Sequence, residues 1–144
     1  MTAKEYLGQV QLLDKRVKVL SERMEETETA LTSISMDLSK ERVQGGRGVD
    51  NLALLEKIDE IGEELYTLKL QLLVKKARIV NQILALSKPV YIHILTERYI
   101  NGRRLDDIKE DPETKYCGVH IYRLHGEALN EFTEMFAPFT DDVI

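Results

Sequence analysis

Mostly apolar residues recur every three or four positions along two long stretches of this chain. The first series consists of Tyr6, Val10, Leu13, Val17, Leu20, Met24, Thr27, Leu31 and Ile34. The second series consists of Leu54, Ile58, Ile61, Leu65, Leu68, Leu72, Lys75, Ile79, Gln82 and Leu86. Residues at this spacing share one face of an α-helix, and that face needs a partner surface to bury it. The two series therefore predict two long helices that pack against each other.

Signals at the ends of these series predict how the two helices are joined. Thr2 and Glu5 have the spacing of a capping box, in which each residue satisfies a free N–H at the start of a helix. Several glycines lie between the two series, and glycine lets a chain reverse direction. Asp50 is the expected N-cap of the second helix. Residues 1–86 are thus predicted to form a long antiparallel coiled-coil helical hairpin, with a Gly-rich tip near 44–49.

The second predicted helix carries a further apolar stripe beside the first. Its members are Tyr66, Leu70, Leu73, Ala77, Val80 and Leu84. When two helices pack against each other, each buries one apolar stripe. Large apolar patches are seldom left exposed to solvent. The base of the hairpin is therefore expected to meet the C-terminal region, a second subunit, or both. A homo-oligomer follows as a prediction, with a dimer favoured.

Residues 87–136 are predicted to form three shorter helices. Pro89 opens the first, because proline is tolerated in a first turn, and Asn101 and Gly102 end it. A short second helix and a long third one, which begins near 116–118, complete a pattern typical of a helix-turn-helix unit. Residues 137–144 are predicted to be a tail or a short docking peptide. The expected core residues are Val90, Ile94, Leu95, Tyr99, Ile100, Leu105, Ile108, Ile121, Leu124, Ala128, Leu129 and Phe132.

The composition agrees with a helical fold. Hydrophobic residues make up 43% of the chain, which contains 3 prolines and no tryptophan; this is too apolar for a disordered chain and too poor in turn residues for an all-β fold. The single cysteine, Cys117, excludes an intramolecular disulfide and is typical of a reducing compartment. Neither a secretory signal nor a membrane span is recognisable. We therefore expect an all-α, cytoplasmic protein with no membrane partner.

Four segments of the sequence resemble a family of small phage and prophage proteins of Gram-positive bacteria. They are MTAKEYL at residues 1–7, ERVQGG at 41–46, RYINGRRLDDI at 98–108 and HIYRLHGEAL at 120–129. Those proteins are similar to region 4 of bacterial sigma factors and to RinA- and ArpU-type late-transcription activators. The likeness covers nearly the whole chain and is most specific from Arg98 to Leu129. It implies a sigma region 4-like helix-turn-helix that regulates transcription in a bacterial host cell.

The resemblance also implies which residues meet double-stranded DNA, with RNA polymerase as a further candidate partner. The groove-facing positions of the recognition helix fall on residues 118, 119, 122 and 123, and two arginines lie near the phosphate backbone. An arginine such as Arg123 can fork to a guanine edge, and the Tyr122 hydroxyl can donate to a phosphate. The complete set is Arg103, Arg104, Lys115, Gly118, Val119, Tyr122 and Arg123.

The charge of the chain is also compatible with functions other than transcriptional regulation. The net charge is −5, and residues 87–130 contain seven basic and seven acidic side chains. A DNA reader gains much of its affinity from excess positive charge, so a single copy is expected to bind DNA weakly and to need a dimer or a polymerase partner. One alternative is a non-enzymatic adaptor or structural protein that uses its helices for protein contacts. Another is a DNA-packaging subunit similar to a small terminase.

No pattern in the sequence indicates catalysis or a cofactor. A nucleophile with a neighbouring base is not recognisable, and the glycines near residue 46 lack the strand and the Lys-Ser/Thr ending of a phosphate-binding loop. Cys117, His120 and His125 offer no obvious fourth ligand for a structural zinc ion. We therefore expect no enzymatic activity, no cofactor and no metal ion.

Overall fold

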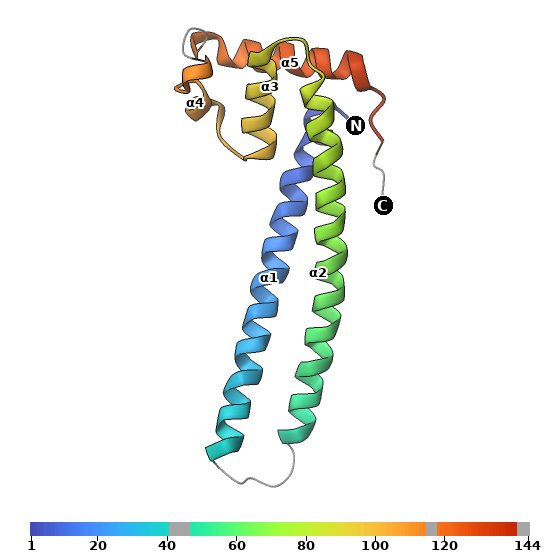
Figure 1. Cartoon of the computed structure of the whole chain (residues 1–144), viewed down its shortest axis with the longest axis vertical. Helices are drawn as coiled ribbons and strands as arrows, with labels where there is room; N and C mark the ends of the chain where they lie inside the picture. The colour runs from blue at the N-terminus through green and yellow to red at the C-terminus, as the bar shows by residue number, and fades with distance from the viewer. Residues whose placement is uncertain (41–46, 115–117, 141–144) are drawn as a thin grey trace. The chain divides into compact units, whose positions relative to one another are not determined.

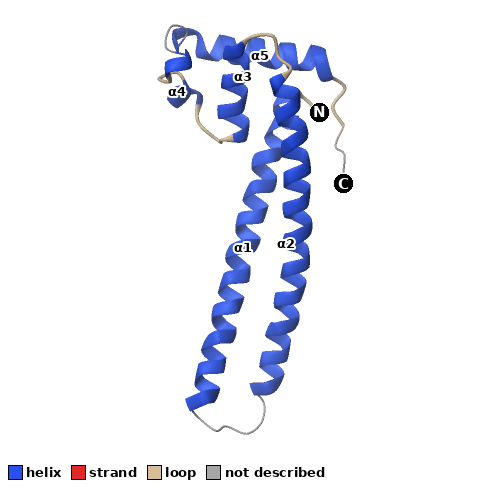
Figure 2. Ribbon diagram, viewed as in Figure 1, coloured by secondary structure: helices blue, strands red, loops and turns tan. Residues whose placement is uncertain are grey.

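The computed structural model describes residues 1–40, 47–114 and 118–140. These residues form helices and connecting segments, and no strand occurs among them (Figures 1 and 2). The predicted all-α class is confirmed for this part of the chain. The described helices include no segment with both the length and the hydropathy that a bilayer crossing requires. The elements are α1 (Ala3–Lys40), α2 (Arg47–Leu84), α3 (Pro89–Leu95), the π-helical turn η1 (Thr96–Ile100), α4 (Leu105–Ile108), the 3-10 turns η2 (Pro112–Thr114) and η3 (Gly118–His120), and α5 (Ile121–Phe136).

The chain divides into two compact units. Unit 1 joins Met1–Leu13 with Gln71–Ile144, and unit 2 is Asp14–Leu70. Each long helix therefore contributes residues to both units. The predicted division into residues 1–86, residues 87–136 and a tail of residues 137–144 stays a prediction.

In unit 2, α1 and α2 lie side by side along the two predicted series. Members of both series in this unit are half-buried or buried, and Ile61 is the most covered of them at 9% exposure. A Cβ atom added at Gly62 of α2 would lie 3.7 Å from the Cε of Met24 in α1. The three-four spacing thus predicts correctly which faces of these helices are covered.

The start of α1 is as predicted, and the start of α2 is earlier. The backbone N–H of Thr2 donates to Glu5 Oε2 at 2.8 Å, and the N–H of Glu5 donates to Thr2 Oγ1 at 3.2 Å. The hydrogen bond from the Thr2 N–H to the carboxylate lowers the pKa of Glu5, because it favours the ionised form. Helix α2 begins at Arg47, three residues before the expected cap at Asp50. Of the predicted tip, residues 44–46 lie outside the described residues.

Unit 1 has a core built from both ends of the chain. Its fully buried side chains include Leu7 from α1, Ile79 and Ile83 from α2, and Phe132 from α5. Tyr6 links the two long helices here, since its hydroxyl donates to Gln82 Oε1 at 2.8 Å. The predicted core residues of the short helices are all buried or half-buried. The base of α1 and α2 therefore packs against the C-terminal helices.

The second stripe on α2 does not form this contact. Tyr66 and Leu70, in unit 2, are 71% and 49% exposed, and Leu73 and Leu84, in unit 1, are 65% and 59% exposed. Ala77 is exposed and Val80 is half-buried. The C-terminal helices cover a different face of α2, which includes Ile83, a residue that belongs to neither predicted stripe. Of the partners expected at the base of the hairpin, the C-terminal region therefore leaves Leu73 and Leu84 of this stripe exposed, and a second subunit stays a prediction.

The turn after α3 has an unusual helical form. Pro89 is at the first position of α3, as predicted, and the helix continues through η1, where the N–H of Asn101 donates to the carbonyl of Thr96 at 3.1 Å. A π-turn joins a donor and an acceptor that are five positions apart in the chain, and it leaves backbone groups to be satisfied elsewhere. Gln11 of α1 donates its side-chain amide to the carbonyl of Arg98 at 2.6 Å. Gly102 then reverses the chain with a φ of 72°, a conformation that favours glycine.

The last helix begins later than predicted. Residues 118–120 form the 3-10 turn η3, and α5 begins at Ile121 instead of near residues 116–118. Glycine and β-branched valine, which fill positions 118 and 119, are both poor helix formers. Beyond α5, the ring of Phe139 stacks on Tyr6 with centroids 4.9 Å apart. The first residues of the predicted tail therefore join the core of unit 1.

Candidate nucleic-acid interface

An exposed surface of unit 1 lies where α5 begins. Val119 and Tyr122 are 94% and 62% exposed, and the Arg123 side chain is 64% exposed. Their spacing of three and four residues places them on one side of successive helical turns. The opposite side of α5 carries buried Ile121 and Leu124, which anchor the helix to α3 and α4. The helix start is thus held firmly while an apolar, a phenolic and a cationic side chain face outward.

Tyr122 is connected to the start of α4. Its hydroxyl donates to Asp106 Oδ1 at 2.5 Å, and Asp106 Oδ2 lies 3.8 Å from Nη2 of Arg104. The bond to the carboxylate raises the pKa of Tyr122, because it favours the protonated hydroxyl. The Arg104 side chain is 80% exposed. Two of the sequence-predicted residues, Arg104 and Tyr122, are therefore brought together by a carboxylate that the prediction did not include.

Arg123 also has an acidic neighbour. Its Nε lies 3.6 Å from Glu127 Oε1, one helical turn further along α5. The other oxygen of this carboxylate accepts a hydrogen bond of 2.9 Å from the Tyr91 hydroxyl. This bond raises the pKa of Tyr91. An exposed ion pair of this kind contributes little to stability, so it can be exchanged for a contact with an anionic partner.

Arg103 is in a different situation from Arg104. Its guanidinium donates to Glu97 Oε2 at 2.8 Å and to both oxygens of Asp111 at 2.7 and 2.8 Å. The side chains of Glu97 and Asp111 are only 20% and 16% exposed. Hydrogen bonds from Arg103 lower the pKa of Glu97 and hold the pKa of Asp111 at about 2. Arg103 therefore joins η1 to the segment after α4, and its role in this structure is to position those elements.

Gly118 and Lys115, the two remaining predicted residues, have two histidines near them in the sequence. Gly118 begins η3, and Lys115 lies outside the described residues. His120 is exposed at the start of α5, whereas His125 is half-buried and its Nε2 lies 2.8 Å from the Tyr99 hydroxyl. Burial lowers the pKa of His125. The two histidines therefore do not form a pair on one surface.

The surface formed by Arg104, Asp106, Val119, Tyr122 and Arg123 is called the α5 face below. It mixes two guanidinium groups with the carboxylates of Asp106 and Glu127, so it has no strong net charge. Its chemistry is that of a binding surface with two arginine forks, one phenol and one large apolar group. The partner role of Asp106 was missed, because its pairing with Tyr122 spans 16 residues and leaves no local pattern.

Gly126 provides a probe of this face that does not alter charge. It lies one turn beyond Tyr122, and a Cβ atom added there would meet nothing within 4 Å. Gly126→Ala is expected to raise the free energy of unfolding by about 0.5–1 kcal/mol, because alanine loses less backbone entropy in a helix. Urea denaturation measures the change. As a control, Gly102→Ala, at a φ of 72°, is expected to lower stability by about 1 kcal/mol. A destabilised Gly126→Ala variant would contradict the open surroundings of this position.

Comparisons with protein-family models, with curated proteins and with solved structures find no match for this chain. No relative thus contributes a name, a ligand or an active residue. The α5 face and the elements that hold it in place are therefore the features that bear on function.

Proposed function

We propose that this chain is a phage- or prophage-type transcriptional regulator that binds promoter DNA through α3, α4 and α5. In this proposal the three helices are a sigma region 4-like helix-turn-helix unit, and α5 is the recognition helix. The helices α1 and α2 act as an antiparallel coiled-coil hairpin. The protein works in the cytoplasm of a bacterial host cell, with or without RNA polymerase.

The observation that supports this proposal is the exposure of Tyr122 and Arg123 at the first turn of α5. A recognition helix reads bases with the residues of its N-terminal turns. Arg123 retains a largely exposed guanidinium, which can form two hydrogen bonds to a guanine edge. Arg104, at the start of α4, is 80% exposed and can contact phosphate. Arg123 is on α5 and Arg104 immediately precedes α4, and these two helices contact each other in unit 1.

The carboxylates near these arginines predict weak binding by one copy. Each phosphate contact adds affinity through counterion release, and Asp106 and Glu127 oppose this by holding negative charge beside Arg104 and Arg123. A dimer doubles the number of contacts without changing the face. The exposed stripe on α2, with Leu73 and Leu84 as its largest members in unit 1, is the surface we assign to this second subunit.

A DNA-binding titration tests the proposal. Fluorescence anisotropy with fragments from the genomic neighbourhood of the coding sequence, at low and physiological salt, is expected to show specific, salt-sensitive binding. Arg123→Ala is expected to cost about 1–3 kcal/mol of binding free energy and to relax base preference. Arg16→Ala, which removes an exposed charge in unit 2, is the matched control. Equal losses for the two variants, or no binding by the folded parent at low salt, would exclude DNA reading by the α5 face.

Asp106→Asn is expected to change the affinity for DNA in the opposite direction from Arg123→Ala. The substitution keeps the side-chain volume, removes a negative charge from the α5 face, and releases Arg104 from its ion pair. Affinity for DNA is therefore expected to rise, by roughly tenfold if one phosphate contact is gained. The salt dependence of binding should become steeper at the same time. Unchanged affinity with a retained fold would show that Arg104 does not approach the phosphate backbone.

A non-enzymatic adaptor is the second candidate, and the exposure of Val119 favours it. A valine that is 94% exposed beside Tyr122 suits the centre of a protein contact better than a polar groove. An adaptor is expected to retain its protein partner in high salt and to lose it in Val119→Asp, while Arg123→Ala has little effect. The reverse pattern, salt-sensitive loss in Arg123→Ala alone, would favour DNA.

A further inference from the structure

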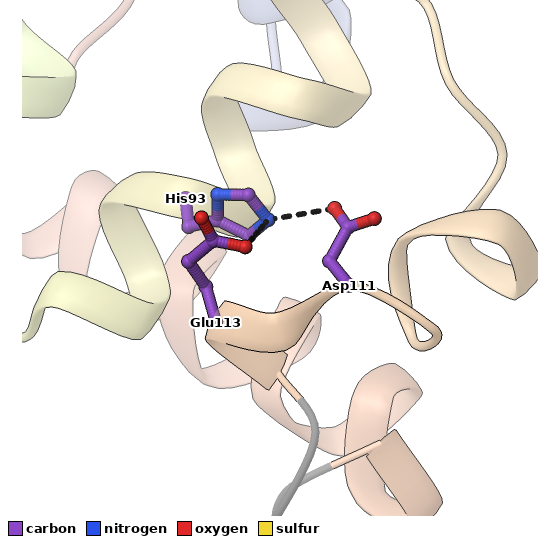
Figure 3. Close-up of side chains that lie close together, drawn as sticks. All are labelled: His93, Asp111 and Glu113. Atoms are coloured by element: carbon purple, nitrogen blue, oxygen red, sulfur yellow. Dashed lines mark hydrogen bonds and ion pairs between the residues drawn. The ribbon is translucent and has the colours of Figure 1, made fainter.

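Three potential metal ligands from two elements converge on one side of unit 1. His93 belongs to α3, Asp111 immediately precedes η2, and Glu113 lies within η2. His93 Nε2 lies 2.8 Å from Asp111 Oδ2 and 3.9 Å from Glu113 Oε2. One ligand atom from each residue lies within 4.8 Å of the other two. Figure 3 shows the imidazole nitrogen directed at both carboxylates.

Buried hydrogen bonds fix this arrangement. The side chain of Thr114 is fully buried, and its hydroxyl lies 2.6 Å from the carbonyl of Ile108 and 3.2 Å from that of Asp111. This holds the turn that presents both carboxylates. Arg103 orients the Asp111 carboxylate with two further hydrogen bonds. Carboxylates that bind metal ions are commonly held by such outer hydrogen bonds, which reduce the reorganisation needed on binding.

The charge around His93 is unbalanced. Two carboxylates, those of Glu97 and Asp111, accept hydrogen bonds from the guanidinium of Arg103, and a third, that of Glu113, lies beside His93. The three carboxylates exceed the one guanidinium by two negative charges. The side chains of His93 and Asp111 are 19% and 16% exposed, while Glu113 is 60% exposed. A hydrated cation can therefore reach the half-buried pair from the Glu113 side.

We propose that His93, Asp111 and Glu113 bind one divalent transition-metal ion, with Zn²⁺ as the reference ion and water completing its coordination. An imidazole nitrogen with two carboxylate oxygens suits Zn²⁺ and its first-row neighbours, whereas Mg²⁺ and Ca²⁺ prefer oxygen alone. The ion takes the place of the His93–Asp111 hydrogen bond and leaves Asp111 in contact with Arg103. It links α3 to the turn after α4, so its effect is to stabilise the elements that support α5.

Calorimetric titration of the full chain with zinc chloride tests this site. The parent is expected to bind one ion, and Glu113→Gln is expected to weaken binding at least tenfold. Glu113 is exposed, so this variant should keep its helicity, which circular dichroism checks. Glu110→Gln is the matched control, because it removes an exposed carboxylate three residues away that is not part of the cluster. A parent that binds no zinc, or a Glu113→Gln variant that binds like the parent, would overturn the proposal.

A second set of variants distinguishes zinc binding at this cluster from zinc binding at other potential ligands in the sequence. Cys117→Ser with His120→Gln is expected to leave zinc affinity unchanged within twofold, while His93→Gln is expected to reduce it at least tenfold. Zinc should raise the melting temperature of the parent by several degrees, and Glu113→Gln should lose this shift. Loss of binding in the Cys117 and His120 variant, with full binding in His93→Gln, would assign the ion elsewhere and exclude the proposed site.

Discussion

Phe132→Ala is expected to lower the free energy of unfolding by about 3–5 kcal/mol, as large aromatic-to-alanine changes in a core do. The Phe132 ring is fully buried in unit 1. Its centroid lies 6.1 Å from that of Tyr6, 4.9 Å from that of Phe136 and 5.7 Å from that of Phe139. Alanine would leave a cavity among rings contributed by both ends of the chain. Since domains of this size have a total stability of about 5–15 kcal/mol, the variant should be close to unfolding at physiological temperature.

Urea denaturation followed by circular dichroism measures this loss. Met135→Ala is the matched control, because Met135 is on the same helix and 46% exposed. Its expected cost is below about 1 kcal/mol. Similar losses for Phe132→Ala and Met135→Ala would mean that the aromatic cluster is not the core of unit 1.

The ion network around Arg103 predicts how stability depends on acid. The bonds from Arg103 hold the pKa of Asp111 at about 2, below its usual value of 3.8. A carboxyl group whose pKa is lowered by folding contributes stability that is fully present above its unfolded pKa and is lost as the pH falls through its folded pKa. Stability of the parent is therefore expected to decrease between about pH 4 and pH 2. Glu97, whose pKa is also lowered, adds to the decrease in the same direction.

Asp111→Asn should remove the Asp111 part of this acid dependence. At neutral pH the variant is expected to melt on the order of 5 °C lower than the parent, because charge-assisted hydrogen bonds become neutral ones. Thermal melts at several pH values between 2 and 7 provide the measurement. Asp107→Asn, an exposed position on α4, should behave like the parent. If Asp111→Asn and the parent lose stability in parallel below pH 4, Arg103 does not act through Asp111.

The long helices were predictable because one repeating pattern determines each of them. Every member of the two series that the structure describes is buried or half-buried, and the Thr2–Glu5 capping box is present. Ile83 was not predicted, since it belongs to a third face of α2 that is covered by residues far away in the sequence. The π-turn η1 was missed for the same reason. It depends on Gln11, which satisfies the Arg98 carbonyl from another helix.

The candidate sites, like the fold, were predictable where a local sequence pattern determines them and not where distant residues do. The family resemblance implied that Val119, Tyr122 and Arg123 face the DNA groove. All three are exposed, and their contact with DNA stays a prediction. The resemblance also grouped Arg103 with Arg104, although one is held by two carboxylates and the other is exposed. Adjacent arginines look alike in a sequence, and only the fold brings Asp111 to one of them. The cluster of His93 with Asp111 and Glu113 has no sequence motif, because His93 lies on α3, 18 residues before Asp111.

The contact between Tyr6 and Phe139 has a consequence for biosynthesis. The two rings stack at 4.9 Å, yet Tyr6 is translated long before Phe139. At about 5–20 residues per second, Tyr6 has to wait on the order of 10 s before its partner exists. During that interval Leu7 and Val10 at the start of α1, which are buried in the finished protein, lack part of their cover. The core of unit 1 can therefore be completed only after translation has reached Phe139.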